Sequence, residues 1–247
     1  MNRAAPLHAD FDLPDAATDD HIREAIYDAI LDHKLPAGTR LVEAPLCEAF
    51  GVTRPILRRV FLRLSHERVI ELQPNRGASV AAPSLQEANH VFEARRIVEQ
   101  GVVAELARRA QRGELGRALA PLRTLIKEEH RVRESGSWKR WIRLSGDFHI
   151  QLAAAHCNDE ITHLLTSLVA RSSLMIGLYE APSHTACSAD EHTAILDAIE
   201  AGENDRAAHL MAEHIGDYAA RLLRAESPEA EVDLRSLFAG SSGRKKK

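Results

Sequence analysis

The sequence predicts a mainly α-helical protein with two domains, a small N-terminal winged helix-turn-helix and a larger antiparallel helical bundle. Residues 51–77 join a glycine turn, an arginine-rich amphipathic helix and a short β-prone run that ends in Pro74-Asn75-Arg76-Gly77. Residues 85–225 show helical periodicity with short breaks and no convincing strand. Aromatic residues make up 4% of the chain, and such a composition is typical of a bundle with short loops.

The winged helix-turn-helix is expected at residues 19–82, behind a mobile tail of residues 1–18 that has no periodicity. Its helices are expected at about 19–35, 45–50 and 54–67, with Thr53 able to cap the third. Pro36 and Gly38 end the first helix, and Gly51 ends the second. A β-wing from Val69 to about Val80 completes the unit.

The bundle is expected at residues 83–227, opened by a capping box in which Ser84 precedes Glu87 by three positions. We expect its helices near 85–110, 114–134, 138–156, 159–179, 184–201 and 203–225. Residues 228–247 are expected to form a disordered tail. Its basic run Arg244–Lys247 could contact DNA, but the composition favours a mobile, solubilising end.

Charge is unevenly distributed along the chain. The formal net charge is −4, yet residues 51–77 carry six arginines against two glutamates, a local balance of +4. A basic patch on an acidic protein is suited to contact with phosphate. Three scattered cysteines favour reduced thiols, and we see no signal peptide or bilayer-spanning run, so the sequence predicts a cytoplasmic protein without a membrane partner.

The third helix is expected to read double-stranded DNA. Its apolar face packs inward, while Arg54 and Arg58 lie outward near its N-terminus, the end that approaches base edges in the major groove. Arginine there can hold guanine through two parallel hydrogen bonds. The remaining DNA contacts are expected from Thr53 to phosphate, from Arg59, Arg63, Asn75 and Arg76 to the backbone, and from close approach at Gly77.

Residues 35–80 resemble the winged helix of the GntR bacterial regulators. The family's successive motifs occur here in order as Ala37-Gly38-Thr39-Arg40-Leu41, Glu43, Gly51-Val52-Thr53-Arg54 and Pro74-Asn75-Arg76-Gly77. Arg58 aligns with the family's DNA-contacting arginine. Arg59 replaces an acidic residue, which implies a different operator preference.

Three histidines, His149, His192 and His214, lie on the apolar stripes of three separate expected helices. One such histidine alone is more often a hydrogen-bonded core residue than a ligand. Three that point into one core favour a divalent metal, because an ion satisfies several buried nitrogens at once.

Residues 85–225 resemble the all-helical FCD effector domain of the FadR-like branch, on the motifs Glu93-Ala94-Arg95-Arg96-Ile97-Val98-Glu99, Phe148-His149, Glu191-His192-Thr193-Ala194-Ile195 and Met211-Ala212-Glu213-His214-Ile215. Many members bind zinc or a similar ion through one aspartate and three histidines. The resemblance implies His149, His192 and His214 as ligands. The aspartate position is Ser145 here, and Asp147 should point elsewhere because it lies about 200° around the helix from His149. Either water or an effector completes the site, or the pocket holds no metal.

The resemblance also implies that Arg95 binds the effector, and we expect Ser145 and Asn158 to contribute to the same pocket. A guanidinium fork matches a carboxylate, so Arg95 could clamp a small carboxylate metabolite. The alternative is a plain helix pair between Arg95 and Glu99. The small Ser145 would leave room for the ligand.

These observations predict a homodimeric, effector-controlled transcriptional regulator, more often a repressor in such families, that reads an inverted repeat and is not an enzyme. A metal-dependent enzyme that uses the three histidines is one alternative. A metal sensor without an organic effector is the other.

Overall fold

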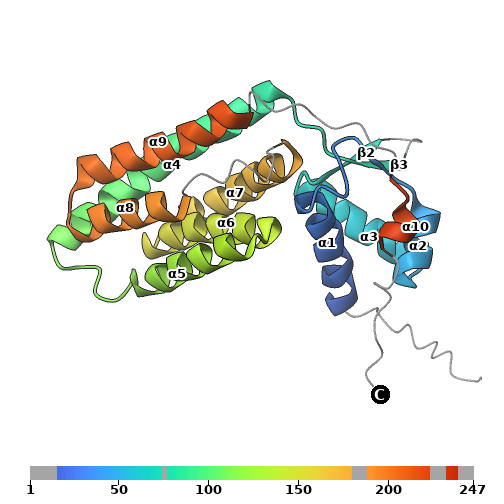
Figure 1. Cartoon of the computed structure of the whole chain (residues 1–247), viewed down its shortest axis with the longest axis horizontal. Coiled ribbons are helices and arrows are strands. Elements are labelled where there is room, and N and C mark those ends of the chain that lie inside the picture. The colour runs from blue at the N-terminus through green and yellow to red at the C-terminus, as the bar shows by residue number, and fades with distance from the viewer. Residues whose placement is uncertain (1–15, 74–76, 180–187, 223–231, 239–247) are drawn as a thin grey trace, which may run out of the picture.

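The computed structural model describes residues 16–73, 77–179, 188–222 and 232–238. It is mostly helical, with a winged helix followed by a helical bundle (Figure 1). The winged helix consists of α1 (Ala16–Leu31), β1 (Arg40–Leu41), α2 (Glu43–Phe50), α3 (Arg54–His66), β2 (Ile70–Gln73) and β3 (Gly77–Val80). The bundle consists of α4 (Leu85–Gln111), α5 (Ala120–Ser135), α6 (Trp138–Ala155), α7 (Asp159–Tyr179), α8 (Ser188–Glu200) and α9 (Asn204–Leu222), and α10 (Leu234–Leu237) follows it.

The wing forms as the sequence predicts. Strands β2 and β3 pair antiparallel, with Ile70 opposite Val80 and Gln73 opposite Gly77. Gly77 has a φ of 84°, a left-handed conformation that glycine adopts without steric cost. The two-residue β1 adds to β3 and gives the sheet order β1-β3-β2; no sequence pattern predicted it.

The winged-helix core joins α1, α2, α3 and the sheet. The apolar stripe of α1, with Ile22, Ile26 and Ile30, is fully buried, as is Leu57 on α3. The arginines of α3 lie on the opposite side and are exposed. This division follows from the amphipathic pattern of the helix, which buries one face and leaves the other to solvent.

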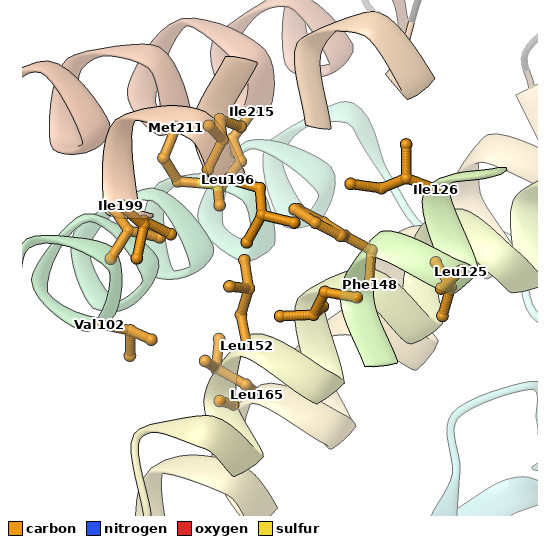
Figure 2. Packing of buried hydrophobic residues seen from close by; sticks show 14 of the residues in the cluster. Val102, Leu125, Ile126, Phe148, Leu152, Leu165, Leu196, Ile199, Met211 and Ile215 are labelled. Atoms are coloured by element: carbon orange, nitrogen blue, oxygen red, sulfur yellow. The ribbon is translucent and has the colours of Figure 1, made fainter. Parts of the chain in front are cut away.

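A second core fills the bundle (Figure 2). Phe148 of α6 points into its centre, near Ile126 of α5 and Leu196 of α8, and Phe148 is fully buried. Phe148 also stacks on the His192 ring, with 3.9 Å between centroids and 18° between planes. The histidine therefore lies inside the packed core, away from water.

Helix α7 meets the length and hydropathy criteria for a membrane span, contrary to the sequence expectation that no run would do so. In the structure it is a core helix, half of whose apolar window is buried, and it packs against α1, α4 and α6. Core helices of this length and composition are common in helical bundles.

Several element boundaries differ from the prediction. Helix α1 begins at Ala16, inside the expected tail, whose residues 1–15 lie outside the described part of the chain. Helix α5 begins at Ala120 rather than near 114, because Gly113 and Gly116 both have positive φ and form a turn. Residues 232–238 lie in the expected disordered tail but are ordered against the winged helix; the rest of that tail, 228–231 and 239–247, is outside the described residues.

Gly177 on α7 provides a test of the contact between the two domains. A Cβ there would lie 2.5 Å from Leu31 Cδ2 and 3.3 Å from Leu31 Cα on α1. We expect Gly177→Ala to lower the free energy of unfolding by about 1–2 kcal/mol, since the overlap outweighs the helix propensity of alanine. Thermal and urea unfolding measure the change.

The matched control is Gly101→Ala on α4, where, apart from its chain neighbours and the backbone of its own helix, no atom of the described residues lies within 4 Å of the added Cβ. Alanine should stabilise that helix by up to about 1 kcal/mol. Equal effects of the two substitutions would contradict a close α1–α7 contact.

Candidate metal centre and DNA-reading helix

The three histidines predicted from sequence meet in the bundle core. His149 lies on α6, His192 on α8 and His214 on α9, and all three are buried. The Nε2 atom of His214 lies 3.3 Å from Nε2 of His192 and 3.2 Å from Nε2 of His149. One ligand nitrogen from each ring lies within 4.8 Å of the others. In a tetrahedral zinc site with bonds of about 2.05 Å, two nitrogens are about 3.3 Å apart, so two of the three separations match.

Each imidazole is held from behind by a carboxylate. Nδ1 of His149 lies 2.5 Å from Glu99 on α4, and Nδ1 of His192 lies 2.8 Å from Glu129 on α5. Nδ1 of His214 lies 2.6 Å from Glu191 on α8. A histidine that binds metal through one nitrogen commonly donates the other N–H to a carboxylate, which fixes the ring's orientation.

This arrangement has a chemical consequence for the Nε2 atoms. A neutral imidazole that donates from Nδ1 carries a lone pair on Nε2. Burial lowers the pKa of His149 to about 3, so this ring is neutral near pH 7. The pKa of His192 is also lowered by burial. Lone pairs that face one another at about 3.3 Å repel, and a divalent cation between them turns that repulsion into attraction. The donor set therefore fits a metal ion.

The charges of the carboxylates differ around the cluster. Burial by itself would raise the pKa of Glu99, but Arg95 and the His149 ring lower it to about 2. Burial raises the pKa of Glu129 to about 8, and its Oε1 has no hydrogen-bond partner among the described residues. A cation bound at His192 would favour the ionised form of Glu129.

Arg95 forms the ion pair with Glu99 that the sequence analysis gave as one alternative. The pair is buried, and Glu99 also contacts His149. Nε of Arg95 donates to Glu99 Oε1 at 2.7 Å, and Nη1 donates to Ser172 Oγ at 2.8 Å. The other oxygen of Glu99 contacts His149. Nη2 of Arg95 is buried without a partner among the described residues, so it remains available to a ligand.

Of the other two predicted pocket residues, Ser145 is buried near the histidines and Asn158 is exposed. Ser145 is buried on α6, one turn before His149, at the position the resemblance assigns to the aspartate ligand. Asp147 is exposed, as the helix geometry predicted. Asn158 is also exposed, and its Oδ1 accepts a hydrogen bond from the Ile161 backbone N–H at the start of α7. This contact gives Asn158 a capping role, and nothing in it supports a contact with an effector.

Helix α3, which the sequence predicts to read DNA, begins at exposed Arg54 after exposed Thr53. Thr53 is the N-cap residue, but its side chain makes no capping hydrogen bond. Arg58 forms a bidentate ion pair with Glu43 on α2, in which Nε and Nη2 lie 2.7 and 3.1 Å from the two carboxylate oxygens. Glu43 thus orients the arginine and leaves Nη1 pointing away from this pair. Such a bidentate contact restricts the guanidinium to one plane.

Arg59 and Arg63 contact α1. Arg59 lies 2.5 and 2.7 Å from the carboxylate oxygens of Asp19, and Arg63 lies 2.6 Å from Asp20. The sequence did not predict these pairs, because the partners are some 40 residues apart. Asn75 and Arg76, the predicted wing contacts, lie outside the described residues.

The sequence did not predict the carboxylates that contact the three histidines. Glu129 is fully buried among Leu122, Leu125 and Ile126 on α5, and a glutamate on an apolar stripe was the available signal. A lone buried carboxylate requires a partner, but no sequence pattern identifies that partner.

Two family profiles match the chain. Residues 18–80 match the description "Bacterial regulatory proteins, gntR family", and residues 90–217 match "FCD domain". No curated protein matches the chain.

Solved structures with the same architecture cover most of the chain. A protein assigned as transcriptional regulator GntR from Rhodococcus sp. RHA1 has 25% identity and a TM-score of 0.69, with coverage of 84% of this chain and 98% of that one. McbR/YncC from E. coli has 18% identity and a TM-score of 0.67, with coverage of 84% and 97%. Lar, which controls the expression of the Listeria monocytogenes agr system, has 16% identity and a TM-score of 0.57, with coverage of 91% and 100%. The last two show likeness of fold alone.

The carboxylate behind His214 can be tested without disturbing a fully buried residue, since the Glu191 side chain is 32% exposed. We expect Glu191→Ala to weaken zinc binding about 10–100-fold, because the His214 ring loses its orienting acceptor. Competition with a chromophoric chelator measures the affinity.

Glu213→Ala is the control, because Glu213 neighbours His214 in sequence but is exposed and pairs only with His209 in the described part of the chain. It removes the same charge. If both variants bind zinc with equal affinity, Glu191 does not orient the ligand.

Proposed function

The chain belongs to the GntR family of bacterial regulators, with a C-terminal FCD domain, and we propose that it is a homodimeric repressor whose DNA affinity is set by a small carboxylate bound beside a metal ion. As a member of this family it is a DNA-binding transcriptional regulator with a C-terminal effector-binding domain. The repressor sign, the dimer, the metal, the effector class and a cytoplasmic location belong to the proposal.

The three-histidine cluster is the observation that carries the proposal. His149, His192 and His214 present three Nε2 atoms to one another, and carboxylates occupy the opposite nitrogens. Zinc suits such a set of imidazole nitrogens. A bound ion would act as an electrophilic anchor for an acceptor atom of the effector. Ser145, where the resemblance places an aspartate, leaves a coordination position for water or for the effector itself.

Arg95 supports a carboxylate as the effector class. Its unpartnered Nη2 donor lies on a side chain that is connected through Glu99 to the His149 ring. A carboxylate that bridges the metal and this guanidinium would satisfy a buried donor and an open coordination position together. Asn158 takes no part in this version of the pocket.

DNA binding is assigned to α3 and the wing. Arg58, oriented by Glu43, and exposed Arg54 would contact base edges, with Thr53, Arg59, Arg63, Asn75, Arg76 and Gly77 at the phosphate backbone. Contact by Arg59 and Arg63 requires that they share or exchange their partners Asp19 and Asp20. Two such helices related by a dimer axis would read an inverted repeat.

Elemental analysis combined with native mass spectrometry of gently purified protein tests the proposal directly. We expect about one zinc or similar ion per chain and a copurified or added carboxylic acid that binds reversibly without turnover. Turnover of the acid would instead favour a metal-dependent enzyme. A switch in DNA affinity by metal alone would favour a metal sensor.

Arg58→Ala tests base reading. Loss of a bidentate contact to guanine costs about 1–3 kcal/mol, so the ratio of operator to random-DNA affinity should fall about 5–150-fold for each half-site. Fluorescence anisotropy on the duplex upstream of its own gene and on random duplex gives the ratio. Arg131→Ala, an exposed arginine on α5, controls for the charge. An unchanged ratio for Arg58→Ala would refute its base-reading role.

His192→Ala tests the pocket. It removes one of three ligands, so bound metal and the response to the effector should fall, while basal DNA affinity persists because α3 is untouched. His209→Ala, a 70% exposed side chain on α9, is the control. Circular dichroism verifies that the buried substitution leaves the fold intact. Undiminished metal content in folded His192→Ala would show that the ligand assignment is wrong.

A further inference from the structure

A cavity lies between the winged helix and the bundle, in the region where α7 packs against α1 (Figure 1). Its volume is about 410 Å³, within the range of about 300–1,000 Å³ that is usual for small-molecule sites. None of its described lining residues belongs to the histidine cluster, to the carboxylates that contact that cluster or to the α3 arginines. The cavity is therefore separate from the metal centre and from the DNA-reading face.

Two arginines line this cavity, one from each domain. Arg68 lies between α3 and β2, and half-buried Arg171 lies on α7. Within the described part of the chain, neither side chain forms an ion pair or a hydrogen bond. Burial and the nearby charge of Arg68 lower the pKa of Arg171, so the two guanidinium groups repel each other. An acid group placed between them would remove that repulsion and satisfy their donors.

The backbone at Arg68 is strained. Its φ is 57°, in the left-handed region. Helix α3 ends in a Schellman motif, in which the backbone N–H of Arg68 donates to Ser65 at 3.0 Å and that of the next residue donates to Leu64 at 2.9 Å. Glycine usually occupies this position, because a Cβ is disfavoured there. A strained residue that keeps a long, unpaired side chain beside a cavity indicates a function for that side chain.

Two carboxylates line the same cavity. Glu71 lies on β2, and Glu87 lies on α4. Glu87 accepts the capping-box hydrogen bonds of Ser84 through Oε2, which leaves Oε1 without a hydrogen bond to a described residue. Those hydrogen bonds, and then the charges of the two arginines, lower the pKa of Glu87, so it is ionised near pH 7.

The remaining lining of the cavity is partly apolar. Ile70 on β2 and Leu174 and Met175 on α7 are all buried and contribute to its wall. The formal charges of the two arginines and the two glutamates cancel. A ligand that suits this lining has an acid group, an amine and an apolar body, because burial of either charge alone would leave the opposite lining charges unsatisfied.

We propose that this cavity binds an α-amino acid with an apolar side chain. The carboxylate of the amino acid binds Arg68 and Arg171, its ammonium binds the two glutamates, and its side chain packs against α7. Because these partners come from the winged helix and from the bundle, the bound amino acid holds the two domains together. The site adds a second ligand to the proposed function, and it requires neither the metal nor the first effector.

Isothermal titration calorimetry of the full chain with L-leucine tests the proposal. Isocaproate has the carbon skeleton and carboxylate of leucine without the ammonium, and isopentylamine has the ammonium without the carboxylate. Loss of a hydrogen bond to a charged partner weakens binding about tenfold or more. We therefore expect L-leucine to bind at least about tenfold more tightly than either analogue.

Substitutions locate the bound probe. Arg68→Gly removes one guanidinium and relieves the left-handed backbone, so L-leucine affinity should fall about tenfold or more while the unfolding temperature does not fall. Arg171→Gln should weaken binding to a similar extent. Glu71→Gln should weaken binding of L-leucine but not of isocaproate, which has no ammonium. Arg131→Gln, which changes an exposed arginine on α5, is the control and should keep the affinity of the unmodified protein.

Three results would overturn the proposal. The first is absence of L-leucine binding at millimolar concentration. The second is equal affinity for L-leucine and either analogue, which would show that the cavity does not pair both charges. The third is loss of L-leucine binding in His192→Ala with full binding in Arg171→Gln, which would place the probe at the histidine cluster. Neither metal content nor DNA affinity enters these measurements, so a failure of the proposed function is distinguished from a failure of this site.

Discussion

Three imidazole nitrogens face one another in a buried helical core, and the packing of five helices determines that geometry. His149, His192 and His214 come from α6, α8 and α9, and the carboxylates behind them come from α4, α5 and α8. Buried polar groups are costly unless each finds a partner. A small shift of any one of these helices would misplace a ring or its carboxylate. The proposed metal binding at this cluster would therefore depend on the relative positions of the bundle helices.

Helix α4 links that cluster to the wing. It starts at Leu85, after a four-residue connection from the end of β3 at Val80, and its capping box at Ser84 and Glu87 defines where the helix begins. Glu99, which contacts His149, and Arg95, which pairs with Glu99, lie on the same helix and are buried. A continuous helix transmits displacement along its axis better than a flexible connection does. A ligand that accepts a hydrogen bond from the unpartnered Nη2 of Arg95 would therefore contact α4, the helix that follows the wing.

How much could be predicted from sequence depended on how local the signal was. The winged helix and the three histidines were predictable, because helical periodicity and turn residues are local patterns. The pairing of Glu129 with His192 was not, because it depends on how α5 meets α8 across 63 residues. Asn158 was predicted to line the effector pocket, but in the structure it caps α7. An asparagine that caps a helix and one that binds a ligand cannot be distinguished by sequence pattern alone. Helix α10 was missed because four residues carry no measurable period, and only burial of Leu234 and Phe238 shows that they pack.

Helix α1 forms side-chain ion pairs with α6 of the bundle and with α3 of the winged helix. On one side, Arg143 of α6, six residues before His149, contacts Asp28 at 2.8 Å and Glu24 at 2.5 Å. On the other side, Asp19 and Asp20 bind the α3 arginines.

Each of these pairs is partly exposed, and such pairs typically contribute less than about 1 kcal/mol. A contact made of several weak pairs can rearrange without loss of either domain's core. Coupling between two sites needs only about 1–3 kcal/mol, which is the sum of a few such pairs. These weak pairs would let the proposed ligand change the position of α3 relative to the bundle without unfolding either domain.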